Sequence, residues 1–145
     1  MAVTAKLYGN WLLKALNKEC DYDTDTIKVA LYTALTPDQD GDIYKSDLTA
    51  TEVVNGNGYA TGGATLANKS ITYDAGTNVI KVDADDVTWA NATITARYAV
   101  IYHSTGVDSS SVLIGYIDFG QDMSSSNGDF KITWDTAGIA TITIS

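Results

Sequence analysis

The first segment of the chain carries apolar residues at helical spacing. Between about residues 4 and 18 the apolar positions recur every three to four residues, and Lys14 and Asn17 fall on the opposite side. Thr4 suits the N-terminal cap of such a helix, and the polar segment at 17–25 suits its exit. The pattern predicts one helix over about residues 4–18, whose apolar side is formed by Tyr8, Trp11, Leu12 and Leu16.

The remaining sequence alternates with a period of two, which is typical of strands. Ile27, Val29 and Leu31 fall on one face of a first strand over residues 27–32. From residue 58 onward, runs of strand-forming residues are separated by turns rich in Gly, Asn, Asp and Ser; the runs cover about 59–67, 69–73, 78–83, 86–90, 93–103, 112–119, 129–134 and 139–144. We therefore expect a mainly β fold in a single domain of residues 1–145. Its architecture would be an antiparallel β-sandwich, or a barrel-like jelly roll, with one N-terminal α-helix.

One long segment shows neither the helical spacing nor the alternation of a strand. Residues 36–57 contain Pro37, the only proline, together with several Asp residues. We expect a long surface loop over about residues 36–57 with one helical turn near residues 45–52. Long loops in compact domains often carry function.

Composition supports the β reading and excludes several kinds of partner. Thr, Val, Ile and Tyr are abundant, and Glu19 and Glu52 are the only glutamates among the 18 acidic residues, so residues that favour surface helices are scarce. The net charge of −9 argues against nucleic acid as a partner, because phosphate neutralisation needs clustered Lys or Arg. We recognise no secretion signal and no membrane helix, which favours folding in a cytoplasm without membrane contact.

Residues suited to nucleophilic catalysis are few. His103 is the only histidine, and its place between an apolar run and Ser104 predicts a partly exposed residue at the end of a strand. Cys20, the only cysteine, stands beside Glu19 and Asp21, which should raise its thiol pKa and leave it without a chemical role. We expect no catalytic residue, although two of the 18 carboxylates could still meet as an acid and base pair.

Metal and phosphate motifs are incomplete. Asp38, Asp40 and Asp42 occupy the first, third and fifth positions of a calcium loop, but glycine stands fourth instead of sixth and Thr49 stands twelfth. Solvated acidic loops are therefore favoured over a calcium site. The glycines at positions 56, 58, 62 and 63 lack the Lys and Ser/Thr of a phosphate loop, and we interpret them as turn residues with positive φ. No metal and no cofactor is predicted.

The aromatic residues in the strands allow two interpretations. Trp89 and Trp134 are expected mainly in the core of a domain of this size. Tyr102 can lie on either face, depending on strand register. If these three rings were exposed, they could instead stack on sugar rings or contact a partner protein.

Taken together, several stretches resemble small virion structural proteins of tailed bacteriophages. The stretches that carry the likeness are Asp86 to Tyr102, Leu113 to Gly120, Thr24 to Leu31, Gly58 to Ala64, Phe130 to Trp134 and Gly138 with Ile139. The resemblance implies a capsid decoration or cement protein, or a head fibre base, that is made in the host cytoplasm and becomes part of the virion by binding the assembled shell. Its partner would be the major capsid protein or another virion protein, and a homo-oligomer, first of all a trimer, would fit the local symmetry of such shells.

The surface through which the chain would bind a partner or a ligand depends on its function. The helix either closes its own core or also carries a subunit or capsid contact, for which the candidates are Leu7, Tyr8, Trp11, Leu12, Leu13 and Leu16. In the alternative function, a tail- or fibre-associated receptor or carbohydrate-binding module, the ligand-facing aromatics would be Trp89, Tyr102 and Trp134.

Overall fold

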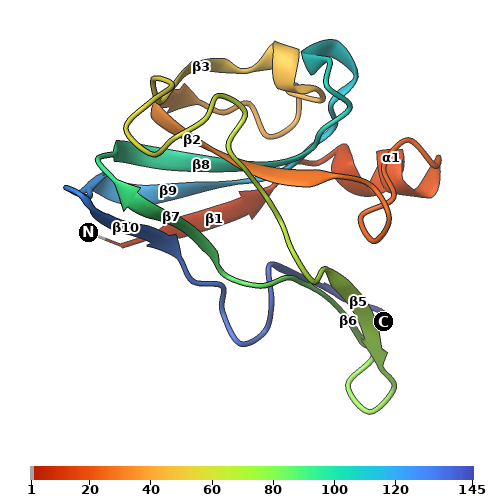
Figure 1. The fold of residues 1–145 in the computed structure, drawn as a ribbon. Coiled ribbons are helices and arrows are strands. Elements are labelled where there is room, and N and C mark those ends of the chain that lie inside the picture. The colour runs from red at the N-terminus through yellow and green to blue at the C-terminus, as the bar shows by residue number, and fades with distance from the viewer. Residues whose placement is uncertain (1) are drawn as a thin grey trace.

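Antiparallel sheets form most of the molecule in the computed structural model, which describes residues 2–145 (Figure 1). The largest sheet has the strand order β1-β9-β8-β2-β3, and β4 also pairs with β2. Its strands are β1 (Thr4–Leu7), β9 (Leu113–Ser124), β8 (Thr95–His103), β2 (Ile27–Thr36), β3 (Thr49–Glu52) and β4 (Ala64–Thr65). A two-stranded sheet of β7 (Val87–Ala92) and β10 (Gly128–Ile132) faces it, which gives the sandwich-like arrangement expected from the alternating pattern.

Strands β8 and β2 of the large sheet are buried on both faces. Ile27, Val29 and Leu31 of β2 belong to the core between the sheets, as the alternation predicts. Ala30 and Tyr32, one residue out of phase, belong to a second cluster on the outer face. The inner core is completed by aromatic packing: the rings of Trp89 and Phe130 lie 6.0 Å apart in an edge-to-face arrangement.

The outer face is covered by the segment predicted to be a loop. Residues 37–48 run across this face, where Leu48 packs against the cluster that contains Tyr8, Tyr32 and Leu113. Backbone hydrogen bonds from Gly9 to Gln39 and from Leu113 to Ile43 hold the segment in place. The helical turn expected near residues 45–52 is confirmed as the 3₁₀ turn η1 (Lys45–Asp47), but the loop expected over residues 36–57 also contains strand β3, which was not predicted.

The N-terminal segment differs from the predicted helix over residues 4–18. Thr4–Leu7 forms β1, which pairs with β9 from Thr4 opposite Asp118 to Leu7 opposite Gly115, and helix α1 covers only Trp11–Leu16. The edge of β9 offers backbone hydrogen bonds to the first residues, and a single segment's periodicity does not reveal such a distant partner. A turn at Tyr8 to Asn10 then separates strand from helix.

A three-stranded sheet forms an arm that projects from the body (Figure 1). It consists of β5 (Ser70–Asp74), β6 (Val79–Asp83) and β11 (Ala140–Thr143), in the order β11-β6-β5. These strands match three of the predicted runs. The predicted strand over 59–67 is reduced to β4, because Gly58, Gly62 and Gly63 all adopt positive φ and turn the chain.

No helix of the described residues is long and apolar enough to cross a membrane.

Candidate functional site

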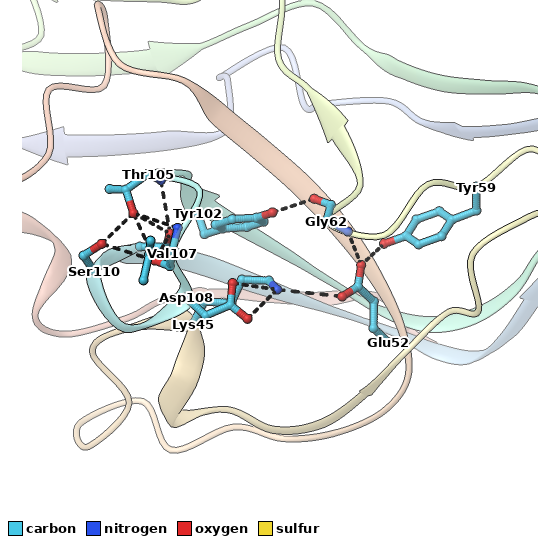
Figure 2. Close-up of polar contacts among 10 residues, drawn as sticks. Lys45, Glu52, Tyr59, Gly62, Tyr102, Thr105, Val107, Asp108 and Ser110 are labelled. Carbon is cyan, nitrogen blue, oxygen red and sulfur yellow. Dashed lines mark hydrogen bonds and ion pairs between the residues drawn. The ribbon is translucent and has the colours of Figure 1, made fainter.

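A connected group of polar side chains lies where β3, the 56–63 turn and the 104–111 loop meet (Figure 2). The Glu52 carboxylate accepts hydrogen bonds from the Tyr59 hydroxyl at 2.7 Å and from the Gly62 backbone N–H at 2.5 Å. The ammonium of Lys45 lies 3.8 Å from the other carboxylate oxygen of Glu52. The Tyr59 hydroxyl in turn accepts a hydrogen bond from the Leu31 backbone N–H at 3.0 Å, so the group reaches the centre of the large sheet.

Lys45 extends this group to the 104–111 loop. Its ammonium also lies 3.2 Å from the carboxylate of Asp108 and 5.5 Å from the ring centroid of Tyr102. The Tyr102 hydroxyl donates to the carbonyl of Gly62 at 2.6 Å, and burial raises the pKa of this phenol to about 12. The loop itself is held by hydrogen bonds of the Thr105, Ser110 and Ser111 hydroxyls.

This group links three separate segments of the chain through hydrogen bonds and ion pairs. The carboxylate of Glu52 is engaged by backbone and side-chain donors, and the phenols it contacts are buried, with raised pKa values. Of the described residues that line the two clefts discussed below, none belongs to this group.

Cys20 and His103 do not form a nucleophile and base pair. Burial, assisted by Asp25 and Asp21, raises the pKa of the Cys20 thiol to about 11, which confirms the expected direction and makes a reactive thiolate scarce. His103 ends β8 as predicted but is 9% exposed, so the expectation of a partly exposed ring was wrong. Its Nε2 lies 3.3 Å from the carboxylate of Asp25, and no hydrogen bond joins thiol and imidazole within residues 2–145.

The Asp-rich turn is organised by its own backbone. The Asp38 carboxylate accepts from the backbone N–H groups of Asp40 and Gly41, and the Asp42 carboxylate accepts from the N–H of Asp38. Such contacts are those of an Asx turn. Across the described part of the chain, no three His, Cys, Asp or Glu side chains gather closely enough to hold a metal ion.

Comparison with protein-family models, with curated proteins and with solved structures gives no match for this chain. The surface geometry therefore carries the functional argument.

The six helix candidates divide into buried and exposed side chains. Tyr8 and Trp11 are buried, in the outer and inner clusters respectively, and Leu7 is half-buried against the inner core. Leu12, Leu13 and Leu16 are exposed, with 76% of Leu16 open to solvent. The N-terminal segment thus closes its own core through Tyr8 and Trp11, while three leucines remain available for contact with another molecule.

A second exposed apolar surface lies on the arm, and none of its arm residues was among the candidates predicted from the sequence. The strand register places Ile71, Val82 and Ala140 in one row and Tyr73, Ile80 and Ile142 in the next, all on one face. Val82 and Ala140 are buried against the body, but Ile71 and Tyr73 are 48% and 57% exposed. A cleft of about 500 Å³ joins this face to Leu12 of α1. We call Leu12, Ile71, Tyr73, Ile80 and Ile142 the arm–helix surface.

The three aromatic candidates are not grouped on an open face. Trp89 and Tyr102 are 6% and 3% exposed, so neither ring is open to a ligand in this structure, and the expected core position of Trp89 is confirmed. Trp134 is half-buried against the core, and its indole N–H donates to the carbonyl of Asp85 at 2.9 Å. Among residues 2–145, Tyr73 is the one aromatic residue in the exposed class.

Proposed function

We propose that this chain is a non-enzymatic virion structural protein, most readily a capsid decoration or cement protein that binds an assembled head shell. The observation that carries the proposal is the arm–helix surface, an apolar face on projecting elements of a well-packed scaffold. A large exposed apolar patch rimmed by polar residues is typical of protein interaction sites. The resemblance of the sequence pattern to small phage virion proteins supports the same function.

The distribution of exposed apolar residues supports assembly over sugar binding. Leu12, Leu13, Leu16 and Ile71 are aliphatic, and Tyr73 is the one exposed aromatic residue among residues 2–145, whereas a carbohydrate platform needs several exposed aromatic rings. Aliphatic faces are buried effectively against another protein, and burial of each such side chain contributes about 1.5–3 kcal/mol. In a decoration protein, many copies of a modest contact add up along the repeating shell, and contacts between neighbouring copies reinforce them.

The negative net charge of the chain is compatible with a decoration protein. The net charge of −9 favours solubility at high copy number before assembly. A homo-oligomer, with a trimer as the first hypothesis, would place arm–helix surfaces from several copies around one local symmetry axis.

Substitution within β5 tests the proposal, because adjacent residues of this strand point to opposite faces. Ile71→Lys places a charge on the arm–helix surface, and Thr72→Lys places the same charge on the polar face of the same strand; both positions are exposed. We expect Ile71→Lys to weaken co-sedimentation with purified shells by about tenfold or more and Thr72→Lys to leave it nearly unchanged. Equal binding by both variants would exclude the arm–helix surface as the contact.

One observation favours the second candidate, a tail- or fibre-associated carbohydrate-binding module. Trp134 lines a cleft of about 430 Å³ on another side of the molecule. Glycan-array binding that is lost in a folded Trp134→Ala variant would support this candidate. Absence of glycan binding by the wild-type chain would leave decoration as the proposal.

A further inference from the structure

The two facing sheets differ in width, and this leaves part of the inner face uncovered. The small sheet contains β7 and β10 alone among the described strands, whereas the large sheet continues beyond β9 to β1. β10 lies over β9, since the rings of Phe130 and Phe119 are 6.2 Å apart. The inner side of β1 and the adjoining part of β9 therefore lack a strand above them.

A cleft of about 430 Å³ occupies this position. Its floor is formed by Ala5 and Leu7 of β1 and by Ile117 and Phe119 of β9, and its wall by Ile132 of β10 and by Trp134. Trp134 is fixed in the wall, because its backbone N–H donates to the Asp86 carboxylate at 3.0 Å and its indole N–H donates to the carbonyl of Asp85. Lys6, Lys131 and Asp135 also line the cleft, so it is mainly apolar with charged residues in its lining, and it is preformed.

Open strand edges lie along the same cleft. Within residues 2–145, β10 pairs with β7 alone, so its other edge has free backbone donors and acceptors. β1 likewise pairs with β9 alone, although the carbonyl of Leu7 accepts a hydrogen bond from the side chain of Gln39. The backbone of Thr133, which lines the cleft directly after β10, also makes no hydrogen bond to another described residue. A free edge beside an apolar floor fits an extended polypeptide, whose backbone pairs with the edge while alternate side chains face the floor.

We propose that this cleft accepts an extended segment of a partner polypeptide, which adds to the free edge of β10 as a third strand of the small sheet. Every second side chain of that segment is apolar and packs on Ile117 and Phe119. The segment covers the inner face of β1 and completes the sandwich. This surface is separate from the arm–helix surface, and the inference holds whether or not the chain decorates a capsid.

A peptide selection with two matched protein variants tests this inference. The probe is a displayed library of peptides of about eight residues, with Val, Ile, Leu or Phe alternating with polar residues. Ala5→Trp fills the cleft from β1. Ala50→Trp, on β3 at the opposite edge of the same sheet, is the control; both alanines are exposed, so neither change removes a buried contact. We expect selected peptides to lose about tenfold or more in affinity for Ala5→Trp and to bind Ala50→Trp like the wild type.

Two further readouts separate strand addition from other forms of apolar binding. N-methylation of alternate peptide backbone nitrogens should abolish binding in one of the two possible phases, because it removes the donors that pair with the edge. Hydrogen exchange of the wild-type chain should slow at amides of residues 128–133 when peptide is bound. Failure to select any peptide, equal binding to Ala5→Trp, or indifference to N-methylation in both phases would each overturn the proposal.

Discussion

The Tyr59 hydroxyl donates a 2.7 Å hydrogen bond to the carboxylate of Glu52. Through this contact a side chain of the edge strand β3 holds the 56–63 turn against the central strand β2, because the same hydroxyl accepts from the Leu31 backbone N–H. The contact explains why one of only two glutamates lies in a half-buried position, next to Lys45.

Removal of this carboxylate should destabilise the fold. Glu52→Ala leaves the Tyr59 hydroxyl and the Gly62 N–H without their acceptor, which costs about 1–3 kcal/mol. We expect a fall in melting temperature on the order of 3–10 °C. The control is Glu19→Ala, because Glu19 is exposed and pairs only at the surface with Lys14 and Tyr44. Calorimetry that shows equal effects of both changes would contradict the role given to Glu52.

Gly63 should be the least replaceable glycine of the turn. Its φ is +82°, and a Cβ at this position would overlap the carbonyl oxygen of Val29. Gly63→Ala therefore combines backbone strain with overpacking, and we expect a loss of about 2–5 kcal/mol in unfolding free energy. Gly56→Ala is the matched comparison: its φ is +115°, and no described atom lies within 4 Å of the added Cβ. In denaturant titrations, Gly56→Ala should lose about 1 kcal/mol of unfolding free energy. A larger loss for Gly56→Ala than for Gly63→Ala would refute this explanation.

Stability should fall in alkaline solution. Burial raises the pKa of Cys20 to about 11 and that of Tyr102 to about 12, and it also raises the pKa values of Tyr8, Tyr22, Tyr32 and Tyr59. These groups are neutral when protonated, so the folded state holds their protons more tightly than the unfolded state. Their contribution is complete below the unfolded pKa values, about 8.5 for Cys and 10 for Tyr. It is lost as the pH rises through the folded values.

Denaturant titrations at several pH values measure this dependence. The unfolding free energy should be flat with respect to these groups near neutrality and should decrease steadily above about pH 9. Cys20→Ala should reduce the slope at the start of that range. An unfolding free energy that rises with pH in the alkaline range would contradict the burial of these groups.

Local pattern was sufficient for most of the fold. The alternation in 27–32 identified the inner face of β2, and the runs at 69–73, 78–83 and 139–144 correspond to the three arm strands. The arm strands were predictable because one face is apolar and the other polar, which fixes the period without knowledge of the partner strand. In β2 the large aliphatic residues alternate in the same way, although Ala30 and Tyr32 make its outer face apolar as well.

Elements determined by distant contacts were missed. Thr4–Leu7 has a sequence compatible with a helix and becomes β1 through pairing with β9, more than a hundred positions away in sequence. The half-buried state of Glu52 and the exposure of Ile71 depend likewise on how separate strands meet. A sequence pattern shows that Ile71 and Tyr73 share a face, but only the arrangement of the arm shows that this face lies open.

The copy number of this chain in purified phage particles tests the central claim most directly. Quantitative mass spectrometry against the major capsid protein gives the ratio. A decoration protein should be present in a fixed ratio to the shell protein, on the order of hundreds of copies per particle. About a dozen copies or fewer per particle would contradict decoration and favour a tail-associated module instead.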